Sequence, residues 1–401
     1  MSSAQPPAPT MLFVSNGHGE DVVGARVASA LLRIRPELRV AAFPLVGIGA
    51  PYRSAGIECL GPRRALPSGG LLLHSLPLLI GDLRAGFLRL TASQLGFLAR
   101  QRPDMLVVVG DVYAQLLSGL VRAPGRFVIQ TLVSAHHAEG LAFSIPTRVF
   151  MERITWIERM LMRFRASRVY VRDPVTEAVL RDAGLAHAVS LGNPIADELD
   201  GSPPHGLAGH QRVVAMLPGS RGYAREALAL MLAAMERLPG ETPLGAVAWS
   251  GGELGATSGW RLSPPEPGDR GLIAVLSKGE LRALVYRDRF ADVLQAARLV
   301  MGTSGTANEQ AVAVGRPVVA FPVPPYYSSA FLANQKRLLG PALTVTSADP
   351  VAIAEAAQRW LDDPAMAERA GRQGRARIGG PGGSSAIAAD MLELSAQASW
   401  S

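Results

Sequence analysis

The stretch 300–310, VMGTSGTANEQ, followed at 315–319 by GRPVV, decides how this chain folds. It predicts a strand at 299–302, a loop of small hydroxylated residues, a helix at 306–314 and a second strand at 317–321. Small residues at Ser304, Gly305 and Thr306 would let a phosphate approach the backbone closely. A helix that begins there points unpaired N–H groups, and the positive end of its dipole, at such a group. We therefore expect an anion-binding loop.

A second segment of the same kind lies earlier in the chain, at 213–221, VVAMLPGSR. A buried strand is predicted at 213–217, and Gly219 and Ser220 in the loop after it offer hydrogen-bond donors. Arg221 adds a permanent cation that can fork to two phosphate oxygens. Two such loops in one half of the chain predict a site for a nucleoside diphosphate. Because the sequence has no Asp-x-Asp pair, we expect no metal and assign charge stabilisation to Arg221 and the helix dipoles.

The composition excludes several other classes of protein. The single cysteine, Cys59, rules out an internal disulfide and a cysteine-based zinc site. The net charge of +7 suits anionic partners such as phosphates and acidic lipid headgroups. No basic run and no basic strand interleaved with aromatic residues is present, so we expect no nucleic-acid partner. No apolar window is long enough to predict a transmembrane helix.

Strand-like and helix-like patterns alternate through both halves, which is typical of parallel sheets covered by helices. We expect an α/β protein with two doubly wound, Rossmann-like domains that face each other across a cleft, with ligands outside the carboxyl ends of the strands. The expected division is a disordered tail at 1–10, an N-terminal acceptor-side domain at 11–196, a linker at 197–210, a C-terminal nucleotide-binding domain at 211–383, and a terminal helix at 384–401 that could pack back on the N-terminal domain.

Taken together, these motifs resemble lipid-A-disaccharide synthase. The resemblance rests on LPGSR at 217–221, SGTA at 304–307, GRP at 315–317, VGIG at 46–49, NGHGED at 16–21 and LGNP at 191–194. It extends over roughly residues 11 to 320 and implies the two-domain glycosyltransferase fold called GT-B. It also implies a nucleotide-sugar donor as substrate, with no cofactor.

Departures from the family pattern indicate a relative of the synthase rather than the synthase itself. Gln310 stands where the family has an acidic residue expected to hold the ribose hydroxyls, and Glu309 lies beside it. Asp111 matches the family's catalytic aspartate with a small offset in register. The aromatic-rich acceptor segment of the family is absent. Gln335, at the start of a later helix, is a candidate contact to the diphosphate or the sugar.

Glycosyl transfer needs a base for the acceptor hydroxyl and stabilisation of the leaving diphosphate. Asp111 follows a predicted strand and is our candidate base, since partial burial there would raise its pKa; the alternative is an N-cap for the following helix. His18 is an alternative base, and Glu20 an alternative acceptor-binding group. They share a loop with Gly17 and Gly19, which could also be a plain tight turn.

The segment 66–100 interleaves apolar clusters with arginine, which suits either a membrane surface or buried core.

From these motifs together we predict an inverting, metal-independent transferase that moves a hexosamine-type sugar from a UDP-sugar to a lipid-linked or phosphorylated acceptor. It would work from the cytoplasm, bound peripherally to the anionic inner face of the membrane. One alternative is a UDP-N-acetylhexosamine 2-epimerase on the same fold. Another is a non-catalytic, membrane-associated protein that binds nucleotide sugars.

Overall fold

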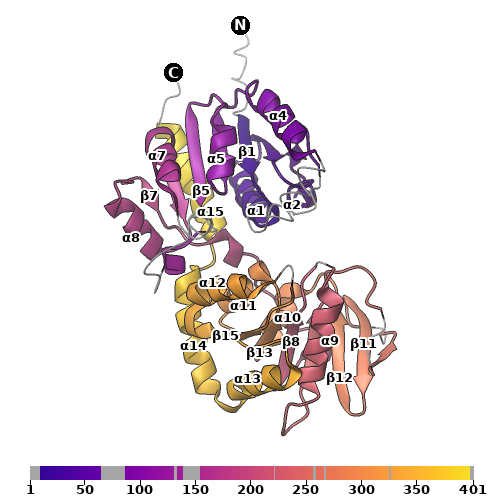
Figure 1. Ribbon diagram of the computed structural model, residues 1–401. Coiled ribbons are helices and arrows are strands. Elements are labelled where there is room, and N and C mark those ends of the chain that lie inside the picture. The colour runs from indigo at the N-terminus through magenta and orange to yellow at the C-terminus, as the bar shows by residue number, and fades with distance from the viewer. Residues whose placement is uncertain are drawn as a thin grey trace. The chain divides into compact units, whose positions relative to one another are not determined.

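The computed structural model describes residues 10–64, 86–130, 133–138, 154–220, 222–255, 259–265, 268–324 and 327–397. The chain divides into two compact units (Figure 1). The first comprises residues 1–197 together with 381–401, and the second residues 198–380. The segment expected as a linker, 197–210, therefore belongs to the second unit from Glu198 onward, where Gly206 N donates to Asp269 Oδ2 at 3.0 Å.

A parallel sheet forms the centre of the first unit. Within the described residues it has seven strands in the order β3-β2-β1-β4-β5-β6-β7. The strands are β1 (Thr10–Ser15), β2 (Arg39–Pro44), β3 (Glu58–Cys59), β4 (Met105–Val109), β5 (Gly125–Gln130), β6 (Arg168–Val171) and β7 (Ala188–Val189). The strand order reverses between β1 and β4, and doubly wound sheets bind ligands at such a point.

Helices cover both faces of this sheet. They are α1 (His18–Ile34), α2 (Ala50–Ser54), α4 (Phe87–Leu98), α5 (Val112–Ser118), η1 (Ala135–Ala138), α7 (Trp156–Arg165), α8 (Pro174–Asp182), η2 (Pro194–Ala196) and α15 (Gly383–Gln397). Side chains alternate along each strand, so Met11 and Phe13 pack against α1 and α15, while Leu12 and Val14 pack on the side of α4, α5 and α7. The first unit thus has one core on each face of its sheet.

The chain returns to the first unit at its C-terminal end. Asp390 on α15 accepts two hydrogen bonds from the Arg168 guanidinium, both at 3.0 Å, and one from the Tyr170 hydroxyl at 2.8 Å. Asp197 accepts a hydrogen bond from Ser384 N at 2.8 Å, which fixes the start of the helix. The C-terminal helix therefore completes the core of the first unit.

The second unit is built around a mixed sheet. Within the described residues its strand order is β10-β11-β12-β9-β8-β13-β14-β15. The strands are β8 (Val213–Leu217), β9 (Leu244–Ala248), β10 (Arg261–Ser263), β11 (Leu272–Lys278), β12 (Leu281–Tyr286), β13 (Leu299–Gly302), β14 (Val318–Ala320) and β15 (Leu343–Val345). Pairing is parallel from β12 to β15, while β10 and β11 add an antiparallel edge.

The second unit also has helices on both sides of its sheet (Figure 1). They are η3 (His205–Leu207), α9 (Ala224–Met235), α10 (Phe290–Ala296), α11 (Gly305–Ala313), α12 (Ser329–Leu339), η4 (Gly340–Ala342), α13 (Pro350–Asp362) and α14 (Pro364–Ile378). In the described parts of both units, no helix is long and apolar enough to cross a bilayer.

Candidate active site

The two predicted phosphate loops leave neighbouring strands of the second unit. Strands β8 and β13 pair in parallel, with Leu217 opposite Gly302, so both loops emerge at the same edge of the sheet. Thr303 N donates to Leu217 O at 3.1 Å, and the Thr303 hydroxyl donates to Pro218 O at 3.1 Å. The first residues of one loop are thus bonded to the first residues of the other.

Tyr223 joins the same two loops from the side. Its hydroxyl donates to Thr303 O at 2.8 Å. Its ring lies against Gly219, where an added Cβ would be 3.2 Å from the Tyr223 hydroxyl oxygen. Gly219 has φ +87, in the left-handed region that favours glycine. The Ser250 hydroxyl, which follows β9, donates to Gly219 O at 3.4 Å. The sequence alone did not point to Tyr223 or Ser250.

The second loop ends at the start of α11. Ser304 is the N-cap residue and has an extended backbone, yet its hydroxyl caps none of the helix N–H groups. Ser304, Gly305 and Thr306 are all partly exposed. The N–H groups of the first helical turn are therefore not satisfied by this side chain and can face an anion. In the other loop Ser220 is exposed, whereas Arg221 lies outside the described residues.

Gln335 supports the second loop from the interior of the second unit. Its side chain is only 4% exposed. Its Nε2 donates to Gly305 O at 2.9 Å, and its Oε1 accepts from the Tyr327 hydroxyl at 2.6 Å and from Asn308 Nδ2 at 3.2 Å. Burial and these three bonds hold the amide in the interior and give Gln335 a positioning role for the loop at Gly305, while its predicted contact with a diphosphate or sugar stays a prediction.

Glu309 and Gln310 take different positions on α11. Gln310 is buried, whereas Glu309 is partly exposed. The pKa of the Tyr327 hydroxyl lies well above its usual value, because of burial first and the charges of Tyr223 and Glu309 next. The Glu309 carboxylate is therefore near the Tyr327 side of the loop network. This places Glu309, rather than Gln310, as the more accessible of the two candidate contacts to a ribose.

In the first unit, Asp111 lies at the carboxyl end of β4, next to the end of β1. Asn16 follows β1, and its Nδ2 donates to Asp111 Oδ1 at 2.9 Å. The same oxygen accepts from Tyr113 N at 3.0 Å and from Ala114 N at 3.5 Å, so Asp111 does cap α5. No other described residue bonds to Oδ2. Burial raises the pKa of Asp111, and the bonds from Ala114, Tyr113 and Asn16 oppose that rise.

Glu20 and Asp21 bring two further carboxyl groups to this edge of the sheet. Burial raises the pKa of Glu20 to about 8, with the charges of Asp111 and Asp21 adding to the effect. Burial likewise raises the pKa of Asp21 to about 7, although the Ser15 hydroxyl donates to it at 2.5 Å. A Cβ added at Gly110 would lie 3.4 Å from Glu20 Cγ, so Glu20 packs beside the turn that carries Asp111.

The remaining residues of the first Gly-rich loop form the start of α1. Gly17 is the N-cap residue with φ -176, an extended conformation open to any residue. His18 is the first helical residue and is exposed, and Gly19 is partly exposed. The structure thus places His18 on the outer side of the helix start, while Glu20 points into the protein.

Glu158 is a fourth carboxyl group that the sequence analysis did not identify as part of the site. It forms a capping box with Thr155 at the start of α7, and Gln130 Nε2 donates to it at 3.0 Å. Burial raises its pKa to about 7, and the nearby charge of Asp111 contributes. The spacing of Thr155 and Glu158 predicts a capping box from the sequence alone. The position of Glu158 near Asp111 cannot be predicted in the same way, because it depends on the pairing of β4 with β5.

These four carboxyl groups differ in the chemistry they can perform. At neutral pH Glu20 holds its proton most of the time and can donate a hydrogen bond, whereas Asp111 has an oxygen left for proton transfer. An array of this kind can bind sugar hydroxyls and accept a proton from one of them. In the described ranges, no group of three His, Cys, Asp or Glu side chains is arranged to hold a metal ion.

Sequence comparison identifies one informative relative. The lipid-A-disaccharide synthase of Granulibacter bethesdensis is 28% identical to this chain over 277 residues, which cover 64% of this chain and 63% of that protein. The chain therefore matches less than two thirds of the length of that relative. No family model matches. The sequence similarity to the synthase expected from the motifs is confirmed.

Comparison with solved structures extends over nearly the whole chain. The calicheamicin glycosyltransferase superimposes with a TM-score of 0.61 at 16% identity, covering 99% of this chain and 100% of that one. MurG of Acinetobacter baumannii gives 0.55 at 13% identity, with 96% and 99% covered. The fold is GT-B. A UDP-N-acetylglucosamine 2-epimerase shares it, with a TM-score of 0.52 at 13% identity and 96% and 95% covered. The GT-B fold predicted from the motifs is thus confirmed.

Proposed function

We propose that this GT-B protein is an inverting, metal-independent glycosyltransferase that moves a hexosamine-type sugar from a UDP-sugar to a lipid-linked or phosphorylated acceptor. The observation that carries the proposal is the hydrogen-bonded pair of loops after β8 and β13, joined through Thr303 and Tyr223. A pyrophosphate suits this arrangement, because two neighbouring strand ends are followed by small residues, one of them leads into a helix N-terminus, and the other is followed in the sequence by Arg221.

The donor would be held by the second unit. The first turn of α11 would donate N–H groups to one phosphate, while Gly219 and Ser220 would approach the other. Arg221 would neutralise the charge that grows on the leaving diphosphate. Glu309 would accept hydrogen bonds from the ribose, with Gln310 beside it. Gln335 would hold the loop at Gly305 in the shape that this binding needs.

The acceptor hydroxyl would be activated by the first unit. Asp111 Oδ2 would take the proton as the hydroxyl attacks the anomeric carbon, and the bond from that carbon to the diphosphate would break. Glu20, which keeps its own proton at neutral pH, would donate a hydrogen bond to a sugar hydroxyl. His18 is the second candidate base, because it begins the helix that carries Glu20.

The proposed acceptor and location rest on two observations. The matched relative is a lipid-A-disaccharide synthase, and this chain carries a net charge of +7. Both favour a lipid-phosphate acceptor at an anionic membrane surface. We therefore place the activity on the cytoplasmic inner face of the membrane, with the protein bound peripherally.

Donor binding is tested with a thermal-shift panel of nucleoside diphosphates on matched glycine variants. Gly219→Ala should remove the stabilisation by UDP, because the added Cβ meets Tyr223 and the backbone has φ +87. Gly279→Ala is the control, since Gly279 also has a positive φ, +58, but has nothing within 4 Å of the added Cβ. If no diphosphate stabilises the unaltered chain, the proposed donor site is wrong.

The reaction type is tested by incubation with UDP-N-acetylhexosamine alone. An epimerase would convert this substrate without any acceptor, whereas the proposed transferase would leave the sugar unchanged until a lipid-phosphate acceptor is added. A binding protein without catalysis would be stabilised by UDP and turn over nothing in either mixture. Formation of the 2-epimer in the absence of acceptor would favour the epimerase and overturn our proposal.

A further inference from the structure

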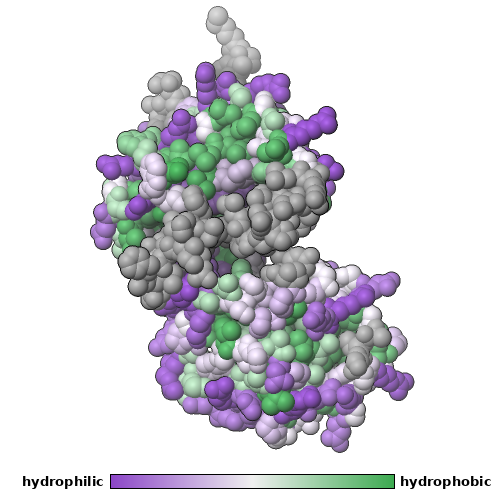
Figure 2. Space-filling model, in the orientation of Figure 1, coloured by the Kyte–Doolittle hydropathy of each residue, from purple (hydrophilic) through white to green (hydrophobic). Residues whose placement is uncertain are grey.

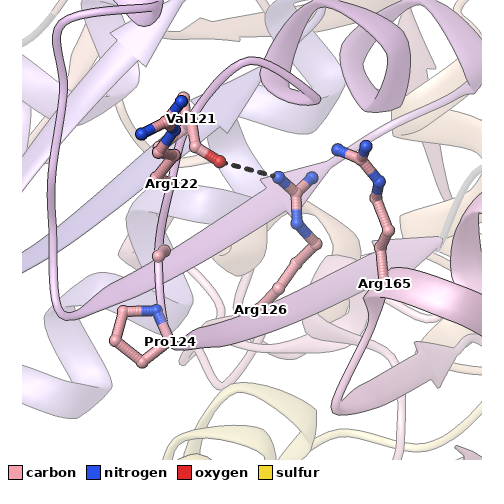
Figure 3. A pocket seen from close by; sticks show the side chains of 6 residues that line it. Val121, Arg122, Pro124, Arg126 and Arg165 are labelled. Atoms are coloured by element: carbon pink, nitrogen blue, oxygen red, sulfur yellow. Dashed lines mark hydrogen bonds between the residues drawn. The ribbon is translucent and has the colours of Figure 1, made fainter.

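A pocket lined by three arginines lies at the amino-terminal edge of the first sheet. It has a volume of about 430 Å³ and lies between the end of α5, the start of β5 and the end of α7. Figure 3 shows its lining, with Arg126 at the centre and Arg122 and Arg165 on either side. Asp111 follows the opposite, carboxyl-terminal end of β4, so the arginine pocket is separate from the candidate active site.

Arg126 is buried without a carboxylate partner. Only 8% of the residue is exposed. Its guanidinium donates to Ser118 O at 2.9 Å and to Val121 O at 3.3 Å, both uncharged acceptors. Burial lowers the pKa of Arg126 to about 10, and the neighbouring charge of Arg165 acts in the same direction. A buried cation beside a second cation is costly, and a bound anion would remove that cost.

The other two arginines of the pocket face solvent. Arg165 Nη1 donates to Gly119 O at 2.7 Å, which holds its guanidinium close to that of Arg126 (Figure 3). Arg122 is exposed on the loop that leads into β5. Among the described residues, no carboxylate forms an ion pair with any of the three. The pocket, which is open to solvent, therefore gathers three positive charges that no described carboxylate pairs with.

An exposed apolar row runs along α7 and ends beside this pocket. Trp156, Met160 and Phe164 are 62%, 49% and 74% exposed. They recur every four residues and so share one face of the helix. The Arg163 guanidinium lies over the Phe164 ring at 5.8 Å from its centroid. Aromatic side chains combined with arginine in this way suit the interface between lipid headgroups and acyl chains.

Helix α5 extends the same apolar surface next to α7. Leu116 and Leu120, at and just beyond the end of α5, are 52% and 47% exposed. Figure 2 shows hydrophobic side chains gathered over the α4, α5 and α7 side of the first unit, with hydrophilic side chains around them. Exposed apolar residues that cluster on adjacent helices indicate a contact surface, whereas single exposed apolar residues are common on any protein surface.

We propose that the pocket formed by Arg122, Arg126 and Arg165 binds the phosphate of an anionic lipid headgroup, while the apolar row of α7 and the end of α5 lie in the surface of the bilayer. Charge and polarity favour this occupant: three cations that no described carboxylate pairs with suit an anion, and the adjacent exposed apolar row suits acyl chains. This lipid site rests on the proposed function only in that both lie at a membrane. Binding of soluble UDP tests the donor site without vesicles, so failure of one site can be told apart from failure of the other.

The test uses the full chain and sedimentation with vesicles of two compositions. One set contains phosphatidylcholine alone, and the other phosphatidylcholine with phosphatidylglycerol. We expect binding to the anionic vesicles only. The double variant Arg122→Gln with Arg165→Gln should lower the partition coefficient about thirty-fold, since two basic residues near the surface are removed. Arg126 is left unchanged, because its burial makes a substitution there a risk to folding.

A matched control removes two charges from parts of the same unit that are remote from the pocket. Arg33 is exposed at the end of α1, on the side of the sheet away from α7, and Arg39 is exposed at the start of β2, three strands from β5. Arg33→Gln with Arg39→Gln should weaken vesicle binding far less than the pocket variant. Equal losses in the two double variants would mean that net charge alone drives binding, which overturns the pocket.

Two further measurements separate the remaining outcomes. Phe164→Ser should reduce binding to anionic vesicles while leaving the UDP-induced thermal shift unchanged. Titration with inorganic phosphate, followed by calorimetry, tests for a soluble anion instead of a lipid. Tight phosphate binding without any vesicle binding would overturn the lipid assignment. A pocket variant that loses thermal stability but partitions normally would show that the arginines serve only to cap α5, and would overturn the proposal as well.

Discussion

Asp111 caps α5 and, in the proposed mechanism, would also serve as the base, with both tasks in one carboxyl group. Its Oδ1 receives the hydrogen bonds from Asn16, Tyr113 and Ala114, so the capping of α5 uses one oxygen. No other described residue bonds to Oδ2, the oxygen left for a substrate proton. The two readings that the sequence left open, an N-cap or a base, are therefore compatible, because they require different atoms of the same side chain.

Substitution of Asp111 by asparagine separates these two tasks. Asparagine is as good an N-cap as aspartate, so α5 should keep its stability. Transfer should fall by about 100-fold or more because the proton acceptor is lost, while UDP-induced thermal stabilisation should remain. Asp349→Asn, at the N-cap of α13 in the second unit, is the control and should leave turnover unchanged. Wild-type turnover in Asp111→Asn would move the base elsewhere, first to His18.

Glu20 should make the stability of the protein depend on pH in a defined direction. Its pKa is raised from 4.5 to about 8, so between these values the native state keeps a proton that the unfolded state has lost. The free energy of unfolding therefore falls as pH rises through this range. Glu20→Gln removes the titrating group and should flatten the decline in melting temperature between about pH 5 and about pH 8.

In Glu20→Gln, the fall of the melting temperature with rising pH should become shallower but should not disappear. Asp21 and Glu158, whose pKa values are raised to about 7, act in the same direction and remain in place. Glu37→Gln is the control: Glu37 is exposed and its pKa is lowered, so it stays ionised throughout this window. An unchanged slope in Glu20→Gln would show that Glu20 is solvated and ionised in the native state.

The residues of the candidate site differ in how far the sequence revealed them. Gly219, Ser304 and Asp111 could be proposed because each follows a short apolar strand, and parallel strands bring their carboxyl ends to one edge. Tyr223 and Glu158 were not proposed because their contacts depend on neighbours in other elements, Thr303 and Gln130. The burial of Gln335 behind Gly305 could not be predicted either, because it depends on how α12 packs.

At the scale of elements, the proposed donor site depends on the pairing of β8 with β13. The register sets Leu217 opposite Gly302, and three hydrogen bonds then join the following loops. Gly302 allows this closeness, since a Cβ there would lie 1.9 Å from Asn308 Oδ1. As a result, the start of α11 packs close to β13 and lies beside the loop that follows β8.

Loss of the Tyr223 hydroxyl should loosen the two loops without unfolding the unit. Tyr223→Phe removes one hydrogen bond, which costs about 0.5–1.5 kcal/mol of stability. The affinity for UDP, measured by calorimetry, should fall several-fold because the loops are no longer held together. Tyr286→Phe is matched, since its hydroxyl donates to Asp269 at 2.7 Å and to neither loop. If both variants bind UDP equally well, the bridge from Tyr223 does not shape the donor site.

Some elements could be predicted from the sequence and others could not. Strands 213–217 and 299–302 have the predicted bounds because they are short, apolar and buried. Helix α14 was not anticipated, since its sequence PAMAERAGRQGRARI is mostly polar or small and has few large apolar residues. It packs through small residues instead: a Cβ added at Gly371 would lie 2.2 Å from Gly315 O. Contact between two backbones leaves no apolar pattern to read.

For the whole molecule, the division into two units follows from the chain's return at residue 381. The sequence predicted two Rossmann-like domains, but it placed the C-terminal boundary at 383 and treated 197–210 as a linker. The structure instead packs the segment after Asp197 on the second unit, where Gln295 Nε2 donates to Leu199 O at 2.9 Å. Such boundaries depend on single polar contacts that a hydrophobic pattern does not encode.

The stability of the first unit should depend on its contact with the last helix. Asp390→Ala removes the acceptor of two bonds from Arg168 and one from Tyr170, and leaves the Arg168 charge without its partner. Because the pair is partly exposed, we expect a loss of about 1–3 kcal/mol in urea unfolding. Glu393→Ala, on an exposed position of the same helix, should cost much less. UDP should still stabilise the second unit in both variants, because its loops lie wholly within residues 198–380. Equal destabilisation by the two substitutions would mean that α15 is held by its apolar face alone, through Ile387, Ala388 and Met391.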